Sequence, residues 1–429
     1  MKIAFTHANV LDGTKDMKPQ ADMTVLVDSD RITAIAKAAA PIPAGYQVVD
    51  LAGKYLLPGM INMHAHMFGT GKPAKSLGTG WQQDFKIGAL STAAGKQVLN
   101  KMVLSDAQMA LYSGVTTLRC VGDFHYSDVI TRDAINAGKA VGPRMLVSGP
   151  ALTVTNGHGD GTFAVTADDP WAFRHLTRTN IKNGVDFIKI CITGGVMDSR
   201  VKGKAGILRM TQQEAEAICQ EAHTAGMIVA SHTECTEGVR TALKAGVDSI
   251  EHGAAMDSEI IKLYKSHKAF VTCTISPAIP MAKLDPSVSL MSEVCQYNSG
   301  IILQGVIDSA KQALENGIPV ALGTDAACPF AMQYNMWREL AYFVKYVGVT
   351  PKFALWSATL NNATLMGLGT ETGSIAVGKS ADLIVCPGNP LDDLRILSRV
   401  EMVMTRGQLL TNPDPHRIPE VEAQLDTLL

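Results

Sequence analysis

The sequence predicts an α/β protein, a (β/α)8 TIM barrel with a small composite β-sandwich domain built from both termini. Through the middle of the chain, apolar β-branched runs alternate with helix-like stretches, as in consecutive βα units of a parallel sheet. Near both ends, short alternating runs are broken by turn residues instead. The candidate barrel strands are 58–66, 115–121, 143–149, 185–193, 228–233, 249–253, 269–276 and 319–325.

The two ends of the chain share a pattern of short runs in which apolar and polar residues alternate, as in half-buried strands. Residues 1–57 and 374–411 each hold too few strands for a stable sheet alone, so we expect them to pair into one domain. The predicted divisions are 1–57 and 371–429 for the composite domain and 58–370 for the barrel. The tail 412–429, with three prolines and mixed charge, is expected to be peripheral.

Metal-binding residue types fall at the ends of several predicted strands. His64 and His66 are one residue apart, so the period of two in a strand puts both imidazoles on one side. Later strands end in or near Lys189, His232, His252 and Asp325. Because the chemistry of such barrels sits at the C-terminal ends of the strands, these six side chains are expected to converge.

This donor set suits catalysis by a divalent metal. Imidazole nitrogens and carboxylate oxygens favour Zn2+, with Mn, Co, Ni or Fe as alternatives by the same donor chemistry. A catalytic ion needs an open position, where the pKa of a bound water falls from 15.7 to about 7 and hydroxide forms at neutral pH. Asp325 is placed to bind one ion and to accept the proton of the attacking hydroxide.

Two segments resemble the metal-dependent amidohydrolase superfamily, and the resemblance spans nearly the whole chain. They are Leu57-Pro58-Gly59-Met60-Ile61-Asn62 before His64-Ala65-His66, and the closing run from Gly373 to Leu383. The chain is most similar to the Xaa-Pro dipeptidase, carboxypeptidase and ochratoxin-hydrolase branch, loosely related to imidazolonepropionase. The resemblance implies two divalent ions, held by His64, His66, His232, His252, Asp325 and a bridging N6-carboxylysine at Lys189.

The predicted function is that of a binuclear metal-dependent hydrolase, which cleaves an amide or peptide C–N bond by attack of metal-bound hydroxide. The alternative is a mononuclear deaminase or cyclic-amidine hydrolase of the imidazolonepropionase type. His232-Thr233-Glu234 favours that alternative through its acidic residue, whereas Lys189 argues against it, because one metal needs no bridge. A non-catalytic scaffold would have no reason to keep all six ligands.

The substrate residues are predicted from loops over the expected site. His158 follows the third strand and His125 the second, although glycine-flanked loop histidines are also common in plain turns. Arg200 lies in a basic loop, where a run of charges is often only solvated, and Tyr297 lies in the long loop 276–298, a candidate lid. Several dipeptidase-like relatives carry an aromatic residue at the position of Glu234, which puts dipeptidase specificity in doubt.

Composition narrows the function classes further. A net charge of −2 gives no basic footprint for nucleic acid or an anionic membrane, and no apolar stretch approaches the length of a membrane span. The first residues turn polar too soon for a signal peptide, and the eight cysteines are scattered, which favours free thiols. We therefore expect a cytoplasmic enzyme, acting on a small molecule and forming a homo-oligomer.

Overall fold

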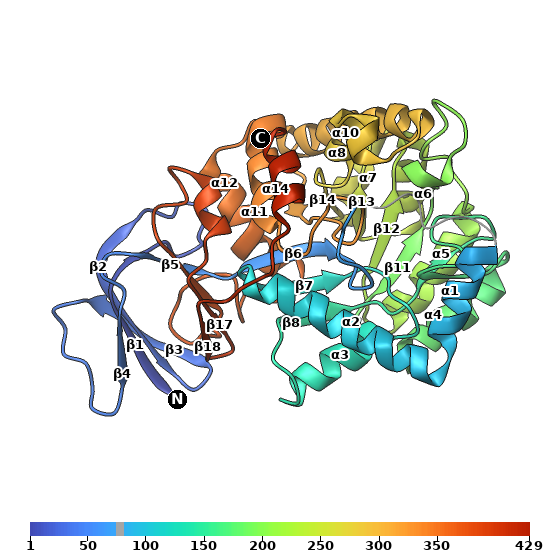
Figure 1. Ribbon diagram of the computed structural model, residues 1–429. Helices are drawn as coiled ribbons and strands as arrows, with labels where there is room; N and C mark the ends of the chain where they lie inside the picture. The colour runs from blue at the N-terminus through green and yellow to red at the C-terminus, as the bar shows by residue number, and fades with distance from the viewer. Residues whose placement is uncertain (74–80) are drawn as a thin grey trace.

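The computed structural model describes residues 1–73 and 81–429 and contains two structural units. A parallel barrel with surrounding helices forms the larger unit, and a mixed β-sheet lies on one side of it (Figure 1). The predicted fold class, a TIM barrel with a β-domain, is thereby confirmed. Within the described residues, we find no helix with both the length and the hydropathy of a membrane span.

The barrel strands follow one another in chain order. They are β6 (Met60–Ala65), β7 (Val115–Cys120), β8 (Arg144–Val147), β9 (Ala151–Thr153), β11 (Ile188–Cys191), β12 (Val229–Thr233), β13 (Ser249–His252), β14 (Phe270–Cys273) and β15 (Val320–Leu322). Neighbouring strands pair in parallel. The barrel closes where the Asp325 amide donates to the His64 carbonyl at 2.8 Å and Ala65 bridges to Ala326.

The third barrel strand is divided, in contrast to the continuous strand predicted at 143–149. Its first part, β8, pairs with β7, and its second part, β9, pairs with β11. The division falls at Gly149, whose φ of +61° is left-handed, and at Pro150, which has no N–H for the ladder. A short strand, β10 (Ala164–Thr166), extends the sheet beside β9.

Helices cover the outside of the barrel. They are α1 (Trp81–Ser91), α2 (Ala93–Tyr112), α3 (Ser127–Asn136), α4 (Pro170–Lys182), α5 (Gln212–Thr224), α6 (Thr236–Ala245), α7 (Ser258–His267), α8 (Ala278–Lys283), α9 (Pro286–Ser289), α10 (Glu293–Glu315), α11 (Met336–Tyr342), α12 (Pro351–Trp356), α13 (Asn362–Leu365) and α14 (Pro419–Asp426), with short 3-10 or π-helical turns η1 (Val196–Asp198), η2 (Phe343–Val347), η3 (Ser357–Asn361) and η4 (Leu394–Ser398). Local sequence explains α5 well, because Thr211 and Glu214 form a capping box at its start and Gly226, with positive φ, follows its end.

The β-domain combines strands from both ends of the chain. Its strands are β1 (Lys2–Val10), β2 (Gln20–Asp28), β3 (Arg31–Lys37), β4 (Gln47–Asp50), β5 (Tyr55–Pro58), β16 (Leu383–Cys386), β17 (Met402–Thr405) and β18 (Gln408–Thr411). They run in the order β18-β17-β16-β5-β1-β2-β3, with β4 beside β1. Phe5, Val25 and Leu383 belong to one buried apolar cluster, so the two ends share a core. The exact divisions at 57/58 and 370/371 remain predictions.

The C-terminal tail packs against the barrel and is less peripheral than its sequence predicted. In α14, Val421 and Leu425 lie four residues apart on one face and are both buried. Arg338, itself buried, pairs with Glu422 at 2.8 Å and with Asp426 at 2.7 Å. The sequence did not indicate this short amphipathic helix, because the prolines before Pro419 are typical of irregular chain.

Candidate metal centre and active-site cavity

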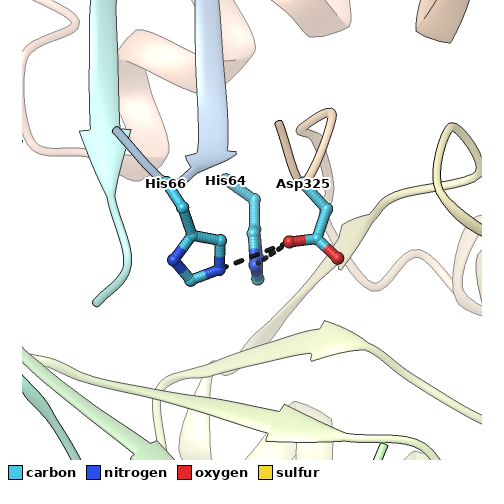
Figure 2. A group of neighbouring side chains, drawn as sticks. All are labelled: His64, His66 and Asp325. Atoms are coloured by element: carbon cyan, nitrogen blue, oxygen red, sulfur yellow. Dashed lines mark ion pairs between the residues drawn. The ribbon is translucent and has the colours of Figure 1, made fainter. Parts of the chain in front are cut away.

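His64, His66 and Asp325 converge at the C-terminal end of the barrel (Figure 2). His64 Nε2 lies 3.3 Å and His66 Nε2 lies 3.4 Å from Asp325 Oδ1. Both imidazoles project from the end of β6, as the period of two predicts, and Asp325 follows β15. The closure of the barrel between β6 and β15 therefore assembles this first group.

Each imidazole of the first group is oriented through its other ring nitrogen. His66 Nδ1 donates to the Gly122 carbonyl at 2.8 Å, and His64 Nδ1 donates to Glu251 Oε2 at 2.6 Å. Glu251 is fully buried and is itself paired with Arg119 Nη2 at 2.6 Å. Hydrogen bonds of this kind hold each ring in place and direct both Nε2 atoms at Asp325.

His232, Glu234 and His252 form a second group beside the first. Its three candidate ligand atoms lie within 4.8 Å of one another. His252 Nδ1 lies 2.6 Å from Thr274 Oγ1, which orients that ring, and the His232 and His252 ring centroids are 4.7 Å apart. The two groups are neighbours, since the His64 and His252 ring centroids are 4.8 Å apart.

The ionisation of both groups suits a divalent cation. Burial lowers the pKa of His66, and lowers those of His232 and His252 further, so these rings are neutral. Burial opposes ionisation of Asp325, but the imidazoles of His64 and His66 outweigh it and hold its pKa well below the usual range. His232 Nε2 is buried with no partner in the described residues, an arrangement that is costly unless a ligand meets that nitrogen. The residues present therefore fit a metal centre.

Lys189 projects from β11 into the same region and is only 1% exposed. Burial lowers the pKa of its amine, while Glu251 and Asp325 act in the opposite direction. The amine is electrostatically coupled to both groups, because it also lowers the pKa values of His232 and His252. A buried amine with a lowered pKa is more often neutral, which is the form that reacts with CO2.

Two of the converging residues have strained backbone conformations. His252 has a φ of +68° and Asp325 a φ of +51°, a region that non-glycine residues rarely adopt. Just before Asp325, a Cβ on Gly323 would lie 2.5 Å from the His64 backbone nitrogen. Glycine at 323 therefore allows the close approach of β15 to β6 that brings Asp325 to the two histidines.

Both groups face a single cavity of about 540 Å3. Its apolar lining includes Phe68, Phe124, Phe163, Met197, Met281 and Ile302. Phe68 and Phe163 stack with ring centroids 5.6 Å apart, and Phe163 also lies 5.0 Å from the His66 ring. The cavity thus has candidate metal ligands at its floor and an aromatic wall, which together suit a small molecule with a bulky apolar part.

Of the substrate residues predicted from sequence, His158 lines this cavity. Its ring stacks on His232 with centroids 4.0 Å apart, and its Nδ1 lies 2.6 Å from Asp198 Oδ2. Burial lowers the pKa of His158, but Asp198 outweighs burial and raises it overall. The carboxylate therefore fixes the ring and favours its cationic form.

The other predicted substrate residues do not line the cavity. His125 Nε2 lies 3.0 Å from Ser91 Oγ, Tyr297 is 54% exposed, and Arg200 lies in an exposed loop. The neighbouring Lys202 is paired with Glu293 of α10, which draws the basic loop toward that helix. The predicted lid 276–298 is largely helical, forming α8, α9 and the start of α10.

The sequence indicated Glu234 only as support for the one-metal alternative, and it gave no role to Glu251 or Arg119. Glu234 lies two residues after His232, so the same period of two that singled out His64 and His66 places it beside that histidine. Glu251 and Arg119 had no comparable signal, because their pairing joins β7 to β13 across the barrel interior.

The comparisons with known proteins identify the family of this chain. The family profile described as "Amidohydrolase family" matches residues 55–410. Ochratoxinase from Aspergillus niger is 28% identical over 425 residues, which cover 90% of this chain and 83% of that protein. These matches confirm the resemblance drawn from the sequence.

Solved structures extend the comparison to the fold. A Bifidobacterium longum structure, provisionally described as a prolidase, is 36% identical with a TM-score of 0.87, covering 100% of this chain and 98% of that one. A Xaa-Pro dipeptidase with methionine bound in its active site is 30% identical with a TM-score of 0.84, covering 96% of this chain and 100% of that one. The chain belongs to the amidohydrolase family and is a hydrolase.

Proposed function

We propose that this hydrolase uses two divalent metal ions, with Zn2+ the first candidate, to cleave amide or peptide C–N bonds in small substrates. The observation that supports this most strongly is the pair of neighbouring histidine–carboxylate groups on the floor of one cavity. The buried Lys189 amine, coupled to both groups, supplies the position for a bridge.

His64, His66 and Asp325 would hold one ion, and His232 and His252 the other, with N6-carboxylated Lys189 between the two. When bound, such a pair of ions polarises the scissile carbonyl and lowers the pKa of the attacking water. Burial of these ligands at the base of the cavity keeps bulk water away from the reacting atoms.

Asp325 is the residue proposed to move the proton. Its Oδ1 faces the two imidazoles, and Figure 2 shows the second carboxylate oxygen pointing away from them. Because Asp325 stays ionised at neutral pH, it can accept the proton of the attacking water. It then returns that proton to the leaving nitrogen, which departs as a neutral amine.

The cavity supports dipeptides or N-acyl amino acids with a bulky apolar group as substrates. The aromatic wall formed by Phe68 and Phe163 offers a surface for that group. His158, held by Asp198, is the group proposed to receive the substrate carboxylate, because its raised pKa favours a cation. The names of the similar proteins, a Xaa-Pro dipeptidase and an ochratoxinase, point to the same kind of bond.

A one-metal deaminase or cyclic-amidine hydrolase is the alternative function. Glu234 favours this alternative, because it places an acidic side chain in the cavity two residues after His232. Such an enzyme would bind one ion per chain, so metal content separates it from the two-metal hydrolase.

A substrate panel tests the proposed function. Xaa-Pro and other dipeptides, N-acyl amino acids and aryl amides are assayed as pairs that differ only in a C-terminal carboxylate or its amide. We expect the acids to have a kcat/KM at least about tenfold higher, equivalent to 1.4 kcal/mol, because of a charge-assisted hydrogen bond to His158.

Metal removal is the control for the same panel. Chelation should abolish hydrolysis, and Zn2+ or Mn2+ should restore it. Equal rates for acid and amide would discard carboxylate recognition, and full activity after verified metal removal would contradict metal-dependent hydrolysis.

A further inference from the structure

Glu234 has a buried carboxyl group with no ion-pair partner closer than 3.9 Å among the described residues. It follows β12 directly, and its side chain is 8% exposed. Its Oε2 lacks a hydrogen-bond partner in the described residues, and so does the buried Nε2 of His232, which lies 3.9 Å away. Burying two such polar atoms without partners is costly, so their juxtaposition calls for a ligand.

The surroundings of Glu234 offer no other explanation for this arrangement. Its backbone amide donates to Thr193 Oγ1 at 3.1 Å, which fixes the residue at the strand end. The neighbouring cationic candidate, His158, already has its Nδ1 beside Asp198. What remains within reach of the carboxylate is the cavity floor, where His232 and His252 present their rings.

The second group then has the same composition as the first. His64, His66 and Asp325 are two imidazoles and a carboxylate, and so are His232, His252 and Glu234. Two ligand atoms on one tetrahedral Zn2+ lie roughly 3.4 Å apart. The 3.9 Å separation of His232 Nε2 and Glu234 Oε2 is slightly longer, within reach of a small side-chain rotation.

We propose that Glu234 is a direct protein ligand of the second metal ion, an inference that rests on the two-metal function proposed above. The second ion then has an anionic ligand from the chain itself, in addition to a carboxylated Lys189. As a consequence, uptake of the second ion does not require CO2 or bicarbonate.

Metal titration of the full chain tests this proposal. Apo-protein is prepared by chelation in CO2-free buffer and titrated with Zn2+, or with Co2+ for its visible absorption, against a competing chelator. Wild type is expected to take up two ions per chain without bicarbonate. Glu234→Gln is expected to lose affinity for the second ion by at least about tenfold. Mutating a residue that only hydrogen-bonds a metal ligand typically lowers metal affinity by about 10–100-fold, so losing a ligand should cost at least the lower figure. Added bicarbonate should restore part of that affinity.

Glu237→Gln is the matched control, because it removes an exposed carboxylate three residues further along and should titrate like wild type. Glu234→Ala provides an independent readout, in which formate, a small carboxylate, is expected to restore the second ion and its Co2+ absorption.

The outcomes separate the two proposals. If Glu234→Gln matches wild type in stoichiometry, affinity and Co2+ absorption, or if wild type needs bicarbonate to bind its second ion, the role of Glu234 is overturned while the two-metal function stands. The role is equally overturned if a folded Glu234→Ala protein gains nothing from formate. If wild type never binds two ions under either condition, both proposals fail.

Discussion

Replacing Asp325 with asparagine is expected to lower kcat by about 10²–10⁴-fold, because an amide nitrogen cannot accept the proton of the attacking water. The substitution keeps the size of the side chain and leaves an oxygen for the contacts with His64 and His66. The fold should therefore persist. Steady-state kinetics on the preferred substrate of the panel, with circular dichroism beside it, measure the effect.

Loss of a metal ion would mimic this effect, so the metal content of Asp325→Asn must be measured in the same samples. A variant with wild-type metal content and kcat reduced by the expected factor supports proton transfer by Asp325. Turnover within a few-fold of wild type would exclude Asp325 as the proton acceptor.

Replacing Glu251 with glutamine is expected to destabilise the protein by about 3–5 kcal/mol, since it leaves the buried Arg119 charge uncompensated. Glu251 is fully buried, and burial opposes its ionisation, but Arg119, His64 and Lys189 together outweigh burial and hold the Glu251 pKa well below its usual range. Urea unfolding measures the loss. The same change weakens the orientation of His64, so affinity for the first ion should fall by about 10–100-fold.

A double-mutant cycle gives the control for Glu251. Arg119→Met with Glu251→Gln should be less destabilising than the sum of the two single changes, because the double variant buries no unpaired charge. Additive losses would show that the Arg119–Glu251 pair is not coupled, contrary to the contact described here.

The barrel and the six converging residues could be predicted because each depends on local pattern. His64 and His66 share a side through strand period alone, and His232, His252 and Asp325 were found by their position at strand ends. The break of the third strand at Gly149-Pro150 had a local signal too, which the apolar run around it masked.

Features that depend on contacts distant in sequence could not be predicted in the same way. Arg200 was expected over the site, but the ion pair of Lys202 with Glu293 draws that loop to α10. The pairing of Arg119 with Glu251 joins residues 132 positions apart, for which strand periodicity gives no signal. Residues in the loops that follow the strands are thus a weaker guide to the composition of the site than residues at the strand ends.

Two metal ions are proposed to share a bridge at Lys189, and a crystal structure of metal-loaded protein grown with bicarbonate tests this most directly. Anomalous scattering counts the ions, and density beyond the Lys189 Nζ reports carboxylation. We predict two divalent ions per chain, bridged by a carboxylated Lys189. One ion per chain at saturating metal, or an unmodified Lys189 that touches neither ion, would contradict the claim.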